Sequence, residues 1–169
     1  MFHSFDNAGP NRSTPRPEWM ALLARAPVAL LESVLADQPA PTLQWLRRPE
    51  TGLYMVQGRA GGTGERFNLG EITVTRCALR AHADDGASVG VAYVKGRNHR
   101  QAQLAALADA LLQDAGQYDA LEQALLGPVR QHLAEQKALR ATRARSTTVD
   151  FFTVARETGT DQDEEEVAE

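Results

Sequence analysis

The segment 59–66 combines the residue types that bind anions in proteins. In order, it consists of Arg59, Ala60, Gly61, Gly62, Thr63, Gly64, Glu65 and Arg66. Glycine accepts a positive φ and leaves backbone N–H groups accessible, so glycines between two arginines could bind a phosphate or another anion. The same glycines are typical of a β-hairpin turn, which needs them for its backbone geometry alone. Taken by itself, the segment favours the hairpin turn.

Glu65 is the acidic residue beside this glycine-rich turn, and it has two interpretations. It could act as a general acid or base, or it could form an ion pair with Arg66 in an ordinary turn. The turn is not a P-loop, because the Lys-Ser/Thr pair that closes such a motif is absent and no helix pattern follows it. It does not match a dinucleotide-binding fingerprint either.

Two further arginines follow in positions that could contact an anion. Arg76 lies in an alternating run, where the period of two places it on an apolar strand face. There it extends to the sheet edge, pairs with an acid or contacts a ligand, and the first two roles are the commoner ones. Arg97 precedes Asn98, a good helix N-cap, and the free N–H groups of that helix start form a second candidate anion site. The residues Lys95, Arg97, His99 and Arg100 lie close to it in the sequence.

Nucleophilic and metal chemistry have little support in the sequence. Cys77 is the one cysteine of the chain and lies in an alternating apolar run, which favours a buried strand residue over a nucleophile. The four histidines are scattered, and no HxxxH or CxxC spacing occurs. We therefore expect no metal site and no cofactor bound by this chain alone.

Charge is distributed unevenly along the 169 residues, although the net charge is only -4. Residues 155–169 carry seven acids and one arginine, which leaves the rest of the chain with a net charge of +2. Nucleic-acid binders usually carry a strongly basic surface, often with aromatic residues beside the cations. A net charge of +2 with few such aromatic residues therefore disfavours nucleic-acid binding. No apolar run is long enough to span a bilayer. We expect a cytoplasmic protein that binds neither nucleic acid nor membrane.

The hydrophobic periodicity predicts an α+β fold with a central antiparallel sheet of about four strands, an N-terminal helical pair and C-terminal helices. The helical pair spans residues 17–26 and a stretch from residue 27, ending before Pro39. Strands are expected near 43–45, 53–56, 72–79 and 89–94, the first two broken by a turn at 50–52. Helices follow from Asn98 to about residue 143, and the last of them is basic and thinly apolar.

One domain is expected over residues 16–156, with a disordered lead-in at 1–15 and an acidic disordered tail at 157–169. Just before that tail, Phe151 and Phe152 form an apolar pair that is costly to leave in water. We expect the pair to dock, either on this domain or on another chain.

Five short motifs occur together in this chain in a specific order. They are Glu50-Thr51-Gly52-Leu53, Arg59 to Phe67 around the glycines, Thr73-Val74-Thr75-Arg76 after Gly70, Gly96-Arg97, and Val149-Asp150-Phe151-Phe152-Thr153. In order and approximate spacing, from about residue 17 to residue 156, they resemble the G subunit of the phosphonate carbon-phosphorus lyase system.

The resemblance implies a non-radical accessory subunit of a bacterial transferase complex. That complex forms ribose 1-methylphosphonate 5-triphosphate from the substrates ATP and methylphosphonate, during organic phosphonate catabolism. The implied partners are the H, I and J subunits of the core complex, with the I subunit contacted most directly, and the ATP-binding-cassette-like K and L subunits. The I subunit is implied to hold most of the catalytic residues, and the iron-sulfur J subunit later breaks the carbon-phosphorus bond.

Three roles for the chain stay open at this level. Its arginines could line an anion site for the triphosphate or the phosphonate, or the chain could be a purely structural assembly subunit whose glycines serve the hairpin alone. A stand-alone anion-binding protein or small hydrolase is the third, and the lack of a nucleophile and base set makes it the weakest.

Overall fold

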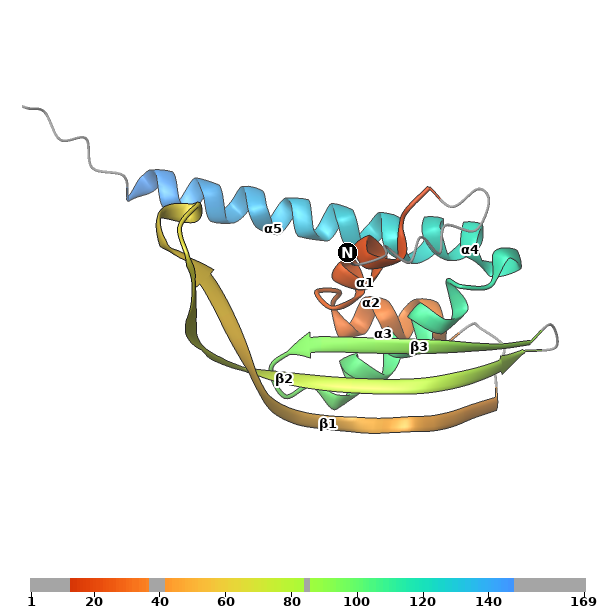
Figure 1. Cartoon of the computed structure of the whole chain (residues 1–169). Coiled ribbons are helices and arrows are strands. Elements are labelled where there is room, and N and C mark those ends of the chain that lie inside the picture. Colours follow the sequence, from red (N-terminus) through yellow and green to blue (C-terminus); the bar gives the residue numbers. More distant parts are fainter. Residues whose placement is uncertain (1–12, 37–41, 84–85, 148–169) are drawn as a thin grey trace, which may run out of the picture.

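A three-stranded antiparallel sheet with helices packed on one face forms the body of the protein. The computed structural model describes residues 13–36, 42–83 and 86–147, and the expected tail, Phe151 and Phe152 lie outside these ranges. The elements are α1 (Arg16–Leu23), α2 (Val28–Leu35), β1 (Thr42–Arg59), β2 (Arg66–Ala83), β3 (Gly86–Lys95), α3 (His99–Leu111), α4 (Ala115–Leu121), a π-helical turn (Glu122–Leu126) and α5 (Gly127–Ser146) (Figure 1). The α+β class, the N-terminal helical pair and the C-terminal helices are confirmed.

The sheet has the order β1-β2-β3, three strands where the sequence predicted about four. The two strands expected on either side of residues 50–52 form one continuous strand, β1. The prediction of a turn at residues 50–52 is therefore wrong. Glu50 pairs with Arg76 and Thr51 with Thr75 inside the ladder, with register irregularities on either side of Arg47. Pro49 is tolerated because β1 lies at the sheet edge, where the missing N–H breaks no necessary ladder bond.

β1 and β2 continue past the end of β3 as a two-stranded ribbon (Figure 1). β3 pairs with β2 only from Val74 to Ala83, so the preceding part of β2 pairs with β1 alone. We call residues 52–73, the ribbon and its turn, the arm. Its large apolar side chains are exposed: Leu53, Tyr54, Met55, Phe67, Leu69 and Ile72.

Side-chain alternation in β2 decides which face of the sheet is buried. Cys77, Leu79 and Ala81 point into the core, whereas Arg76 and Arg80 lie on the other face and are not buried. The core face packs against α3, whose buried residues are mostly alanine. Trp19 and Leu23 of α1 and Leu31 of α2 complete the core with the large residues that follow α3, namely Leu112, Leu121, Leu125, Leu126 and Val129.

α3 approaches the sheet very closely at Gly90 of β3. A Cβ atom added at Gly90 would lie 1.8 Å from the carbonyl oxygen of Ala106 and 2.8 Å from the amide nitrogen of Ala110. These distances are far below van der Waals contact, so the helix and strand backbones pack together only because residue 90 is glycine. Small residues on α3 and Gly90 thus set the separation of the two layers.

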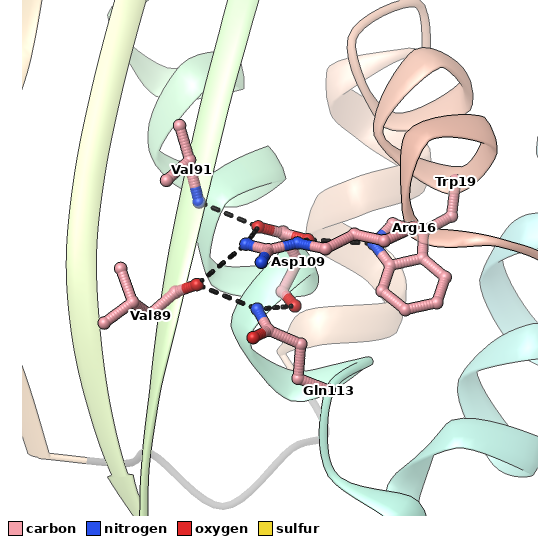
Figure 2. Close-up of polar contacts among 6 residues, drawn as sticks. All are labelled: Arg16, Trp19, Val89, Val91, Asp109 and Gln113. Atoms are coloured by element: carbon pink, nitrogen blue, oxygen red, sulfur yellow. Dashed lines mark hydrogen bonds and ion pairs between the residues drawn. The ribbon is translucent and has the colours of Figure 1, made fainter. Parts of the chain in front are cut away.

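The carboxylate of Asp109, on α3, joins α1 to the outer edge of β3 (Figure 2). Its side chain is fully buried and accepts hydrogen bonds from Arg16 Nε at 3.2 Å and Nη2 at 2.8 Å, Trp19 Nε1 at 2.8 Å and the Val91 amide at 2.9 Å. Arg16 and Gln113 donate to the nearby Val89 carbonyl. Two edge groups of β3, the Val89 carbonyl and the Val91 amide, are therefore hydrogen-bonded by side chains where no further strand of the described ranges pairs with β3.

A second polar cluster holds the residues before α1 against the C-terminal helices. The amide of Thr14 donates to the Tyr118 hydroxyl at 2.9 Å, and Arg130 contacts both Glu122, at 2.6 Å, and the Thr14 hydroxyl. Thr14 is buried.

None of the helices within the described ranges is long and apolar enough to cross a membrane. The expected cytoplasmic location stays a prediction.

Replacing Asp109 by asparagine should destabilise the protein strongly. The amide cannot accept all four hydrogen bonds, and Arg16 would lose its partner, so we expect the free energy of unfolding to fall by about 3–5 kcal/mol. The measurement is urea unfolding of the wild-type and Asp109→Asn proteins. Asp114→Asn is the matched control, because Asp114 caps α4 and asparagine caps a helix equally well. A loss below about 1 kcal/mol for Asp109→Asn would contradict this account.

Gly90→Ala should be still more damaging than an ordinary overpacking substitution, which costs about 1–3 kcal/mol. The new methyl group meets backbone atoms that can move only if α3 moves, so we expect a loss above about 3 kcal/mol or a failure to fold. Gly52→Ala is the control, since a Cβ at Gly52 has no atom within 4 Å. Equal stability of the two variants, measured by the same unfolding experiment, would show that the close approach is not required.

Candidate functional site

The glycine-rich segment forms the turn at the end of the arm, between β1 and β2. Gly61 and Gly62 have φ values of 57° and 82°, and the Gly64 amide donates to the Ala60 carbonyl at 2.8 Å. A Cβ at Gly64 would lie 2.7 Å from that same carbonyl oxygen. The hairpin interpretation of the glycines is therefore confirmed, and the turn geometry accounts for them without a ligand.

The polar residues of this turn are open to solvent. Arg59 and Arg66 are the last facing pair of the two strands, and Arg59 Nη1 donates to the Gly64 carbonyl at 3.4 Å. Thr63, Glu65 and both arginines are exposed. The expected ion pair between Glu65 and Arg66 is absent, although the structure describes both residues. The tip thus presents two arginines that no acid of the described ranges neutralises.

Arg76 is paired with an acid, one of the two common roles predicted for an arginine on that strand face. Its Nε atom lies 2.6 Å from Glu50 Oε1, and Arg47 Nη1 lies 2.6 Å from the same oxygen. Hydrogen bonds from Arg76 first and Arg47 second hold the pKa of Glu50 below its ordinary value. All three side chains are about half exposed, so the cluster orders the open face of the sheet and adds little stability.

The start of α3 forms the cap that the sequence predicted. The Asn98 side chain accepts from the Gln101 amide at 2.9 Å. Two of the residues expected to make an anion site there have other partners, since His99 Nε2 is 2.9 Å from the Thr51 hydroxyl and Arg100 pairs with Glu32 at 2.8 Å. Arg97 is exposed. The helix start is therefore tied mainly to β1 and α2.

The candidate arginines are not gathered into one site within this chain. Arg66 and Arg76 are ten residues apart along strand β2, a length of up to about 33 Å. Arg97 lies just beyond β3, whose last residue pairs with Val74. An anion bound at the tip would thus be out of reach of Arg76 and Arg97.

A cation-rich cleft of about 670 Å³ lies instead between α1 and α5, where these two helices are neighbours (Figure 1). We call it the basic cleft, and it is lined by Leu22, Ala24, Arg25, Lys95, Arg130, Leu133, Ala134, Gln136, Lys137 and Arg140. Lys95 and Lys137 are the only lysines of the whole chain. The sequence does carry a signal for it, because Arg130, Lys137 and Arg140 are spaced by seven and three residues and share one face of α5.

Cys77 is buried in the core, as the sequence predicted. Burial raises the pKa of its thiol to about 11, because the apolar surroundings disfavour the thiolate. A thiol of that pKa is almost entirely protonated near neutral pH. Cys77 is thus a packing residue and not a nucleophile.

Comparison with known proteins assigns the chain to a family. Residues 14–157 match the family described as phosphonate metabolism protein PhnG. A protein of Rhizobium meliloti (strain 1021), named alpha-D-ribose 1-methylphosphonate 5-triphosphate synthase subunit PhnG, is 40% identical over 142 residues, which cover 83% of this chain and 88% of the relative. The matched residues 14–157 span every helix and strand that the structure describes, including the arm. The chain therefore belongs to the PhnG family of phosphonate metabolism proteins.

Proposed function

We propose that this chain is an accessory subunit of a transferase complex that forms ribose 1-methylphosphonate 5-triphosphate from ATP and methylphosphonate. The observation that carries the proposal is the 40% identity, over 83% of the chain, to a protein named as a subunit of that synthase. A buried thiol with a raised pKa removes the one cysteine from consideration as a nucleophile. The name of the relative supports a chain that acts together with other subunits, and the buried thiol supports placing the central chemistry elsewhere in the complex.

The arm is the feature that best suits attachment to another subunit. Leu53 is 67% exposed and Leu69 is 66% exposed, and apolar side chains occur on both faces of the ribbon. An isolated two-stranded ribbon is marginally stable in water, and burial of such side chains contributes about 1.5–3 kcal/mol each. Docking on a partner would bury apolar surface that this chain leaves in solvent.

Within this proposal, the partners are the H, I and J subunits of the carbon-phosphorus lyase core, with the ATP-binding-cassette-like K and L subunits at the level of the larger assembly. The I subunit is the one we place against the arm. A docked arm would carry Arg59 and Arg66 away from this chain's body and into the neighbouring subunit. The tip arginines would then contact the triphosphate or the phosphonate in a shared site.

A purely structural role is the second candidate, and specific observations favour it. The positive φ values of Gly61 and Gly62 are explained by the turn, and Arg76 is explained by its pairing with Glu50. In this alternative the arginines hold strands or partner carboxylates together, and none of them touches substrate. The two candidates differ in whether the tip affects turnover or only assembly.

Leu53→Ser combined with Leu69→Ser should abolish or strongly weaken assembly while the chain stays folded. Loss of two apolar anchors should weaken association by about 3 kcal/mol or more, about a hundredfold in Kd. Both residues are exposed, so the free energy of unfolding of the chain should change by less than about 0.5 kcal/mol. The measurement is co-purification with the co-expressed synthase subunits, with Leu139→Ser, at a 62% exposed leucine of α5, as control. Unchanged co-purification of the double variant would rule out the arm as the attachment point.

Arg66→Ala should lower synthesis of ribose 1-methylphosphonate 5-triphosphate by about tenfold or more in an otherwise intact complex. The expected cause is the loss of a hydrogen bond to a charged group, which is worth about 1.5–3 kcal/mol. The measurement is product formation per assembled complex, compared with Arg48→Ala, an exposed arginine of β1 outside the arm. Loss of assembly with normal turnover per complex would favour the structural role. If Arg66→Ala changed neither assembly nor turnover, the proposal that the tip contacts substrate would be refuted.

A further inference from the structure

The basic cleft holds four cations that no acid of the described ranges neutralises. Arg130 pairs with Glu122 at 2.6 Å, but Arg25, Lys95, Lys137 and Arg140 form no ion pair with any residue that the structure describes. Arg25 Nε donates to the Ala21 carbonyl at 2.8 Å, and Arg140 Nη2 donates to the Gln136 side-chain oxygen at 3.5 Å. Like charges lining one cleft repel one another, so an anionic occupant is strongly favoured there.

The size and lining of the cleft indicate what kind of occupant it suits. A cleft of about 670 Å³ is much larger than a single small anion needs and lies within the usual range of ligand sites. Its cations come from the segment after α1, the end of β3 and helix α5, and Leu22 and Leu133 also line it. This arrangement matches several anionic groups spaced along a chain.

The same polypeptide carries such a series of anionic groups directly after the family region. Residues 157–169 contain Glu157, Asp161, Asp163, Glu164, Glu165, Glu166 and Glu169 and no cation. The family match ends at residue 157, so every acid of this segment except Glu157 lies beyond that match. We propose that the acidic segment 157–169 binds in the basic cleft of its own chain.

The connection between the two is long enough for this contact. Helix α5 ends at Ser146, so ten residues, 147–156, link it to Glu157, and they can span up to about 35 Å. From Ser146 back to Arg130 is sixteen helical residues, or about 24 Å. The acidic segment can therefore reach every cation on α5, and its tether supplies an effective concentration in the millimolar range.

Carbodiimide coupling offers a direct test, because it joins a lysine amine to a carboxylate only where the two are in contact. Both lysines of the chain line the cleft, so the lysine partner of every such product reports on the cleft. In the full chain, purified together with its synthase partners, we expect Lys95 or Lys137 to couple to acids of 157–169, identified by mass spectrometry. Mixed light and heavy isotope-labelled preparations should give predominantly same-isotope products.

Variants make the test specific to the cleft. Arg25→Gln with Arg140→Gln, or a rise in NaCl from 50 to 500 mM, should lower the coupling yield by about threefold or more, because exposed ion pairs are screened. Arg145→Gln, in the last turn of the same helix and outside the cleft, should leave the yield unchanged. Absence of lysine-to-tail products, products only between different chains, or equal yields in the cleft and control variants would overturn the proposal.

Competition with inorganic tripolyphosphate gives a second, independent readout. A chain truncated after Arg156 has lost the tethered occupant, so it should bind tripolyphosphate about tenfold more tightly than the full chain at the same ionic strength. Lys137→Ala in the truncated chain should reverse that gain. Equal affinity of the full and truncated chains would assign the cleft to a free phosphate ligand and refute occupancy by the acidic segment.

Discussion

The buried carboxylate of Asp109 is the interaction on which the rest of the structure depends. Four hydrogen bonds reach it from Arg16, Trp19 and the β3 backbone, so one side chain fixes α1, α3 and the sheet edge relative to one another. A buried charge is tolerated only when it is fully paired, and here each oxygen accepts two donors. Because α1 forms one wall of the basic cleft, the shape of that cleft also depends on this contact.

The body and the arm differ in how much of their apolar surface is buried. In the body, alanines of α3 and Gly90 of β3 allow the helix and sheet backbones to approach until no space for a methyl group is left. In the arm, the ladder between β1 and β2 satisfies the backbone, but the apolar side chains on the ribbon stay exposed. Exposed apolar side chains are unfavourable in water. Their presence on the arm is consistent with a chain that functions as one subunit among several.

Some cations of the chain pair with acids, and others gather where no acid of the described ranges neutralises them. Arg16, Arg47, Arg76, Arg100 and Arg130 each contact an acid and hold elements together. Two arginines of the hairpin tip and four of the five cations of the basic cleft have no such acid among the described residues, and they occupy the end of the arm and the face between α1 and α5. These cations are Arg59, Arg66, Arg25, Lys95, Lys137 and Arg140. The tip and the cleft are thus two places where several cations without an acidic partner lie close together, and contact with anions or with another chain is possible there.

The sequence by itself determined whatever depends on local periodicity and turn chemistry. The helical pair, the Asn98 cap, the hairpin at the glycines, the burial of Cys77 and the ordered motifs of the family were all predictable, because each follows from residues close together in the chain. The continuity of β1 through Pro49 was not predictable, because an edge position in the sheet removes the penalty that a proline would otherwise carry. Only the tertiary structure showed that the arginines flanking the glycines lie far from Arg76, and that Arg25, Lys95 and the cations of α5 line one cleft. Distances between residues remote in sequence are set by packing, and packing here depends on the contacts of Asp109 and Gly90.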